Sequence, residues 1–182
     1  MTLISPQEAP NLSPLPVVAA EEWYAAYTYS RHEKRVAQQL QERGVDHFLP
    51  VYRSVRRWKD RKKELELVLF PGYVFVHLEL VKRLQVLQLP GVVRFVCFNG
   101  QPAALPTEDI EALRNGLSHN VCAEHHPFLN IGRRVKVVYG PLTGAQGILV
   151  RRRNNSRLVI SIEAIMRSVA VEIDEADVVP VT

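Results

Sequence analysis

The spacing of apolar residues changes near residue 120, and this change restricts the chain to a fold with two different parts. Before it, strand-like runs at 23–28 and 73–78 alternate with helix-spaced segments. A mixture of strands and helices followed by strands alone indicates an α+β class with a separate all-β unit. The 182 residues suffice for two small cores. The later part has only short strand-like runs, at 134–139, 147–152, 157–162, 168–173 and 178–179.

The first part predicts a split β-α-β arrangement, also called ferredoxin-like, in which two helices cover one face of an antiparallel sheet. Ser30 and Glu33 have the spacing of a capping box, so the first helix is expected to begin at Ser30. The second helix is expected to turn Leu84 and Leu87 inward. The expected elements are strands at 23–28, 47–52, 73–78 and 92–98, helices at 30–44, 81–89 and 107–116, and a hairpin within 53–70.

Composition divides the chain into four segments. Residues 1–20 contain four prolines and little periodicity, which is typical of a flexible leader. The sheet-and-helix unit is expected at 21–117 and a linker at 118–128. Five short strands at 129–182 predict a small closed barrel, because closure removes exposed strand edges.

A dense run of cations lies on the predicted hairpin and is opposed within the run only by Asp60. Such a density attracts phosphates, and each neutralised phosphate releases counterions. The alternative is a hairpin that uses its charge only for solvation. The cations are Arg53, Arg56, Arg57, Lys59, Arg61, Lys62 and Lys63, with Trp58 among them.

Two further groups of residues are candidates for binding. The start of the first helix carries Arg31, His32, Lys34 and Arg35, where free backbone N–H groups also favour an anion; a merely soluble helix face is the alternative. The second group is aromatic and suits a partner helix or, alternatively, the core. It comprises Trp23 and Tyr24 on the first strand and Phe70, Pro71 and Tyr73 around a turn.

No catalytic motif is found, so no catalytic residue, cofactor or enzymatic activity is expected. His119, Cys122, His125 and His126 resemble a metal site, but they lack a second spaced pair of ligands, and no metal is predicted. No apolar stretch is long enough for a membrane span, and the two cysteines have no Cys-x-x-Cys spacing. We therefore expect a cytoplasmic monomer without membrane contact.

Three segments resemble the NusG family in the same order along the chain. They are the Trp-Tyr pair at 23–24 with the helix after it, Leu-Phe-Pro-Gly-Tyr-Val-Phe-Val at 69–76, and Pro-Gly-Val at 90–92. A fourth, Gly-Pro-Leu-Thr-Gly-Ala-Gln-Gly at 140–147, resembles the KOW motif of an SH3-like barrel. The resemblance implies an N-terminal domain that binds RNA polymerase, followed by a KOW barrel.

The resemblance also implies roles for the candidate residues. Trp23, Phe70, Pro71 and Tyr73 would form a hydrophobic pocket for the clamp helices of bacterial RNA polymerase. The helix start and the basic hairpin would contact DNA, either the non-template strand or the upstream duplex. The protein would then suppress pausing as a transcription elongation factor or antiterminator.

The barrel would recruit a further partner, either Rho or a small-subunit ribosomal protein, through the loop with Ile165, Met166 and Arg167, in which Ile165 would be the apolar anchor. Leu142 and Ala145 stand where housekeeping members usually carry aromatics, so the chain is more similar to specialised paralogues that antiterminate polysaccharide operons. A ribosome-associated RNA-binding protein is the alternative function. The KOW residues are Gly140, Pro141, Leu142, Gly144 and Gly147.

Overall fold

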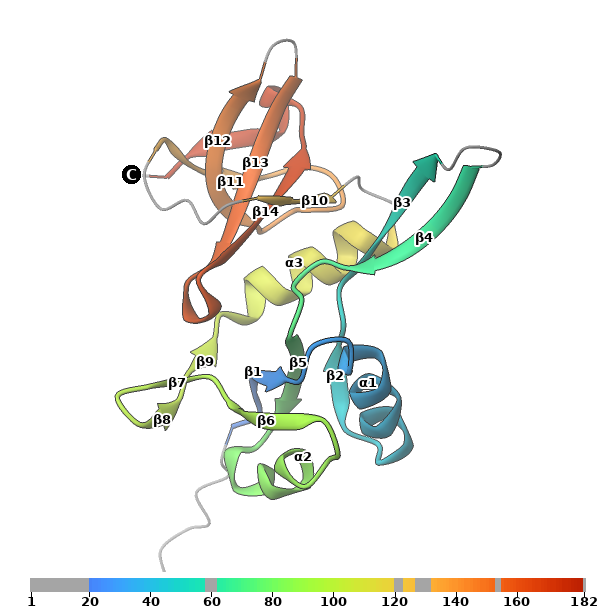
Figure 1. Cartoon of the computed structure of the whole chain (residues 1–182). Coiled ribbons are helices and arrows are strands. Elements are labelled where there is room, and N and C mark those ends of the chain that lie inside the picture. Colours follow the sequence, from blue (N-terminus) through green and yellow to red (C-terminus); the bar gives the residue numbers. More distant parts are fainter. Residues whose placement is uncertain (1–19, 58–61, 120–122, 127–131, 153–154, 182) are drawn as a thin grey trace, which may run out of the picture.

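The fold was analysed in a computed structural model. The structure describes residues 20–57, 62–119, 123–126, 132–152 and 155–181. Its first part combines one principal sheet with three α-helices, and its second part forms a sheet of strands (Figure 1). The predicted α+β class with an all-β second part is confirmed.

The principal sheet of the first part has the order β2-β5-β1-β6, and all its pairs are antiparallel. Strand β1 is central and pairs with three neighbours, because β9 also lies along its beginning. The strands are β1 (Glu22–Thr28), β2 (Asp46–Phe48), β5 (Tyr73–Leu78), β6 (Val92–Phe95) and β9 (Ala104–Leu105).

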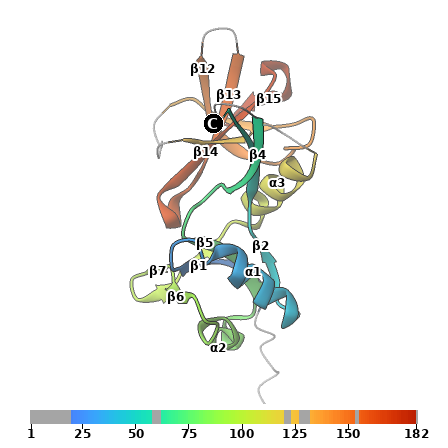
Figure 2. The ribbon, with the colours of Figure 1, turned by 45° about the vertical axis from the view of Figure 1, so that its right-hand side comes forward.

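Helices α1 (Glu33–Glu42) and α2 (Leu84–Leu87) cover one face of this sheet, as predicted. Successive side chains of a strand point to opposite faces. Tyr24 and Ala26 therefore pack with the two helices, while Trp23 and Ala25 point to the other face. That second face packs against α3 (Thr107–Ser118), which lies between the sheet and the second part of the chain (Figures 1 and 2).

Two predictions about the helices were wrong. Helix α1 begins at Glu33 rather than Ser30, because Arg31 has a left-handed backbone with φ of 64°. No side chain caps the helix, since the Glu33 carboxylate bonds elsewhere. The segment predicted as one helix at 81–89 is a short 3-10 turn, η1 (Leu80–Lys82), followed by α2. This break changes the helical phase, so that Val86 is buried and Leu84 is 59% exposed.

The predicted hairpin is present as β3 (Val51–Arg57) and β4 (Lys62–Val68), which pair in register from Val51↔Val68 to Arg57↔Lys62. A smaller hairpin, β7 (Cys97–Phe98) and β8 (Gln101–Pro102), follows β6.

The second part is a six-stranded antiparallel sheet with the order β10-β14-β13-β12-β11-β15. The structure differs from the predicted linker at 118–128, because residues 123–126 form β10 and pair with β14. Its strands are β10 (Ala123–His126), β11 (Arg134–Val137), β12 (Gln146–Arg152), β13 (Asn155–Ile162), β14 (Arg167–Glu172) and β15 (Val178–Pro180), with 3-10 turns η2 (Glu163–Ile165) and η3 (Glu175–Asp177).

Candidate functional site

Three turns that are far apart in the sequence meet at the end of β1. The backbone N–H of Thr28 donates to the Gly72 carbonyl at 2.8 Å, and that of Tyr29 donates to the Gly91 carbonyl at 2.9 Å. In return, the Gly72 N–H donates to Oε1 of the buried Glu33 carboxylate at 2.7 Å. The Phe-Pro-Gly-Tyr turn and the start of α1 are thereby held together as one structural unit.

The glycines of two of these turns are required by geometry. Gly72 and Gly91 have φ of 86° and 107°, in the left-handed region that side chains rarely adopt. A Cβ on Gly91 would lie 3.1 Å from Val36 and 3.2 Å from the Cβ of His32. The Pro-Gly turn therefore approaches α1 as closely as it does only because it has no side chain there.

The candidate aromatic residues divide into buried and accessible ones. Phe70 is fully buried and packs edge-on against Phe75 at a ring distance of 5.8 Å. Trp23 is 1% exposed, because the guanidinium of Arg114 on α3 lies 5.5 Å from its ring and His77 packs beside it. The structure thus places Trp23 beneath α3 and apart from the surface of the turn.

The accessible part of the turn continues onto the sheet. Pro71 is exposed and Tyr73 is half-buried. Tyr73 pairs in register with Tyr27, whose ring lies 5.5 Å away and is 39% exposed, and Arg94 pairs with Tyr27 from the other side. We call Pro71, Tyr73, Tyr27 and Arg94 the aromatic row. Tyr27 and Arg94 were not predicted as site residues, although Tyr27 lies four residues after Trp23 and therefore on the same strand face.

The cations at the start of α1 are accessible but not equivalent. Arg31, Lys34 and Arg35 are exposed, and His32 is half-buried. The Lys34 ammonium lies 2.7 Å from the Glu66 carboxylate of β4, and this hydrogen bond holds the pKa of Glu66 below its usual value. Among the residues that the structure describes, no salt bridge involves Arg31 or Arg35, so these two carry the unopposed charge.

The basic hairpin lies near this helix start, since the Lys34–Glu66 pair joins α1 to β4. The strand pairing places Arg56 opposite Lys63 and Arg57 opposite Lys62. Lys59 and Arg61 lie outside the described residues. The structure therefore places the part of β4 around Glu66 beside the helix start, whereas the paired cations lie three and four residues farther along the hairpin.

The loop predicted to bind a partner of the barrel presents one apolar side chain. Ile165, the expected apolar anchor, is only 4% exposed because it packs into the hydrophobic core, whereas Met166 is 62% exposed and has a left-handed backbone with φ of 51°. Arg167 beside it is exposed. In the KOW segment, Leu142 is buried, while Gly140 and Pro141 are exposed and Gly144 is half-buried. A Cβ on Gly147 would meet the Val159 carbonyl oxygen at 2.5 Å, so close strand packing requires this glycine.

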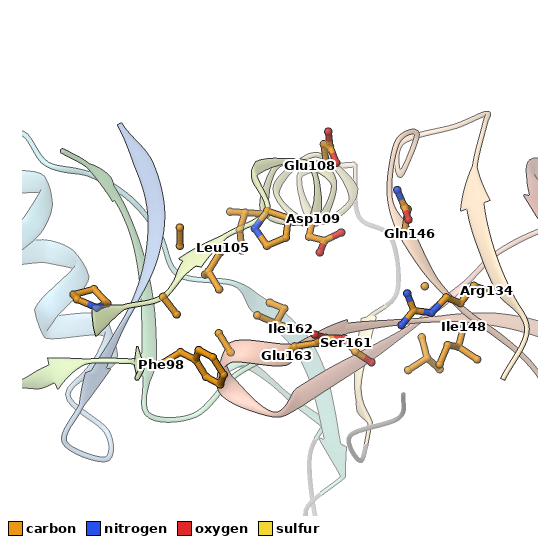
Figure 3. A pocket seen from close by; sticks show the side chains of 18 of the residues that line it. Phe98, Leu105, Glu108, Asp109, Arg134, Gln146, Ile148, Ser161, Ile162 and Glu163 are labelled. Atoms are coloured by element: carbon orange, nitrogen blue, oxygen red, sulfur yellow. The ribbon is translucent and has the colours of Figure 1, made fainter. Parts of the chain in front are cut away.

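A cavity of about 980 Å³ lies between the first part and the six-stranded sheet of the second part (Figure 3). Leu105 and Asp109 line it from one side, and Arg134 and Ile162 from the other. Burial raises the pKa of Asp109 to about 6, with smaller contributions from the nearby carboxylates of Glu108 and Glu163. The seam between the two parts therefore contains a carboxyl group whose pKa is raised by burial.

Within the described parts of the chain, no group of three or more His, Cys, Asp or Glu residues is arranged to hold a metal ion. Cys122 of the predicted metal-like group lies outside these parts, and His125 and His126 are consecutive residues of β10. None of the described helices is long and apolar enough to cross a membrane.

Comparison with known proteins identifies similar sequences. A family model described as "Transcription termination factor nusG" matches residues 21–114. The NusG protein of Helicobacter pylori strain J99, named a transcription termination/antitermination protein, is 30% identical over 132 residues, which cover 66% of this chain and 75% of that protein. The identically named protein of Lactococcus lactis is 28% identical and covers 84% of this chain and 89% of that protein.

A solved structure, described as the domain interaction in Thermotoga maritima NusG, has a similar fold. It aligns with a TM-score of 0.53 and 21% identity over 89% of this chain and 98% of that chain. The match of the family model extends over β1, the Phe-Pro-Gly-Tyr turn and α3 up to residue 114. The resemblance noted in the sequence is thereby confirmed, and the chain belongs to the NusG family.

Proposed function

We propose that this protein binds bacterial RNA polymerase through the aromatic row and acts as an elongation and antitermination factor. NusG-family members are transcription factors, and the relatives' names include both termination and antitermination. The observation that carries the proposal is the Glu33–Gly72 hydrogen bond, which joins the Phe-Pro-Gly-Tyr turn to the cationic start of α1. One rigid unit then presents an apolar surface for a protein beside a basic surface for nucleic acid.

The polymerase contact is assigned to the accessible side chains. Pro71, Tyr73 and Tyr27 combine apolar surface with hydroxyl groups, a composition suited to a partner helix such as those of the polymerase clamp. Phe70 anchors the turn, because its ring packs against Phe75 and its carbonyl accepts the N–H of Tyr73 at 3.1 Å. Trp23 acts indirectly in this arrangement, because it is covered by α3.

The nucleic-acid contact is assigned to Arg31, His32 and Arg35 together with the basic hairpin. The exposed cations at the start of α1 and the cation-rich sequence of the hairpin both attract phosphates electrostatically. We assign this contact to DNA beside the polymerase. Contact with both polymerase and DNA would suppress pausing without any catalytic step.

We assign a recruiting role to the barrel. We take the barrel as residues 129–182 and the polymerase-binding unit before it as residues 21–117. Exposed Met166 and Arg167 are the contact residues that its loop offers to a ribosomal protein or Rho. The departures at Leu142 and Ala145 favour a specialised paralogue, in which binding to Rho is weakened.

Transcription by purified bacterial polymerase on a long template, with and without this protein, tests the function. We expect less pausing with the wild-type chain and loss of the effect in Tyr73→Ala. Tyr139→Ala is the matched control, because Tyr139 is a 69% exposed tyrosine of the barrel part. An unchanged pause pattern, or co-sedimentation with ribosomes without polymerase binding, would refute the proposal. Addition of Rho distinguishes a specialised paralogue from a housekeeping factor, since suppression of Rho-dependent termination would mark the specialised paralogue.

A further inference from the structure

The cavity between the two parts has the size and the walls of a small-molecule site. Its volume of about 980 Å³ lies near the upper end of the range of roughly 300–1,000 Å³ that ligand pockets occupy. Pro102 and Leu105 line it from the first part, and Ile148 and Ile162 line it from the second. Leu105, Ile148 and Ile162 are only 3–5% exposed, so the core fixes their positions. The cavity therefore offers a preformed apolar surface to the body of a ligand.

Three carboxyl groups give this cavity a negative charge. Glu108 and Asp109 of α3 and Glu163 of η2 all belong to its lining, and Figure 3 shows the Asp109 side chain pointing from the helix into the cavity. Arg134 is the only cation among the described lining residues, and no salt bridge joins it to any of the three carboxylates. A ligand in this cavity thus meets a net negative charge.

Asp109 is the carboxyl group that most needs a partner. Burial is the largest cause of the rise of its pKa to about 6, and the charges of Glu108 and Glu163 add to it. No described residue donates a hydrogen bond to the Asp109 carboxylate or forms a salt bridge with it. A carboxylate withdrawn from water without a cation or a donor is unfavourable. A protonated amine supplies both, since it is a cation with hydrogen-bond donors.

We propose that this cavity binds a small organic amine, whose protonated nitrogen pairs with the Asp109 carboxylate while its apolar body lies between Leu105 and Ile162. An anionic ligand would be repelled by the three carboxylates, and a neutral one would leave Asp109 without a partner. None of the lining residues belongs to the aromatic row or to the cations assigned to nucleic acid. The inference therefore goes beyond the proposed function and does not depend on it.

Isothermal titration of the full chain with three ligands of the same apolar body tests the charge preference. The ligands are 4-phenylbutylamine, the neutral 4-phenylbutan-1-ol and the anionic 4-phenylbutanoate. At about pH 8 the amine is protonated and Asp109 is ionised, because this pH lies above the Asp109 pKa of about 6. We expect the amine to bind at one site per chain and the alcohol to bind at least about 10-fold more weakly, the lower end for a hydrogen bond to a charged group. The anion should not bind.

Three variants locate the site. Asp109→Asn keeps the size of the side chain but removes its charge, so it should weaken amine binding by about 10- to 150-fold and leave alcohol binding unchanged. Glu111→Gln removes a carboxylate of the same helix that does not line the cavity, and it should bind the amine as the wild type does. Ala104→Trp places a large side chain at the wall and should weaken both ligands. Thermal unfolding without ligand verifies that each variant is folded.

Several results would overturn the inference. They are a wild-type chain that does not bind 4-phenylbutylamine up to its solubility limit, an alcohol that binds as tightly as the amine, and an unchanged amine affinity in folded Asp109→Asn. Equal weakening by Asp109→Asn and Glu111→Gln would also overturn it, because attraction would then come from the general charge of α3. Loss of amine binding in Asp109→Asn alone, together with weaker binding of both ligands in Ala104→Trp, supports the site.

Discussion

Replacement of Glu33 by alanine is expected to lower the free energy of unfolding by about 2–3 kcal/mol. The Glu33 side chain is 5% exposed and accepts the Gly72 N–H at 2.7 Å. A hydrogen bond to a charged group contributes about 1.5–3 kcal/mol, and its removal leaves a buried N–H without a partner. Because Gly72 also bonds to Thr28, the loss should loosen the Phe-Pro-Gly-Tyr turn relative to β1.

Two control variants isolate this contact. Glu33→Gln keeps the length of the side chain and an acceptor oxygen but removes the charge, so a smaller loss of about 1 kcal/mol is expected. Glu42→Ala makes the same substitution at the exposed end of the same helix. It should change stability by less than about 0.5 kcal/mol, as is usual for surface positions.

Urea unfolding of the full chain, followed by tryptophan fluorescence, measures these differences, since Trp23 lies in the core of the same unit. The variants are compared by the urea concentration at the midpoint of unfolding, at a constant slope of free energy against urea concentration. A Glu33→Ala variant as stable as Glu42→Ala would refute the view that this carboxylate joins the two surfaces. The same variant should bind polymerase more weakly, even at a temperature where it remains folded.

Other substitutions test the geometry elsewhere. Gly91→Ala should cost more stability in thermal unfolding than Gly44→Ala, because both glycines have positive φ but only Gly91 has close neighbours; equal costs would refute the close approach. Asp109 has a pKa of about 6 against an ordinary 3.8, so ionisation in the folded state is unfavourable and stability falls as pH rises between these values. Asp109→Asn should therefore raise the melting temperature at pH 7.5 and leave it unchanged near the ordinary pKa, and a gain at both pH values would contradict this assignment. A double-mutant cycle of Arg114→Ala and Asp46→Ala should give a coupling below about 1 kcal/mol, because the 2.9 Å pair is solvent-exposed.

Local periodicity was sufficient to predict much of the fold. The predicted runs at 134–139, 147–152, 157–162 and 168–173 match β11 to β14 within a few residues, because alternation of apolar and polar side chains is a local property of a strand. The hairpin of β3 and β4 was predicted for the same reason. The order of strands and helices in the first part then restricted the topology to the split β-α-β arrangement.

Long-range contacts explain why some predictions from the local sequence pattern were wrong. Ser30 and Glu33 have the spacing of a capping box, but the Glu33 carboxylate bonds to Gly72, 39 residues away. The helical phase of 81–89 was also wrong, because the chain breaks into η1 and α2 before Leu84. Strand β10 has no readable alternation, and it becomes a strand through pairing with β14.

The features of the candidate site also divide into those that the sequence determined and those that the tertiary structure decided. The sequence by itself determined which residues are cationic, which turns require glycine and where aromatics gather, because these are properties of residue type. Only the tertiary structure decided that Trp23 lies beneath α3 while Tyr27 and Tyr29 remain accessible. The burial of a side chain depends on which distant element packs over it, and the neighbouring residues in the sequence do not specify that element.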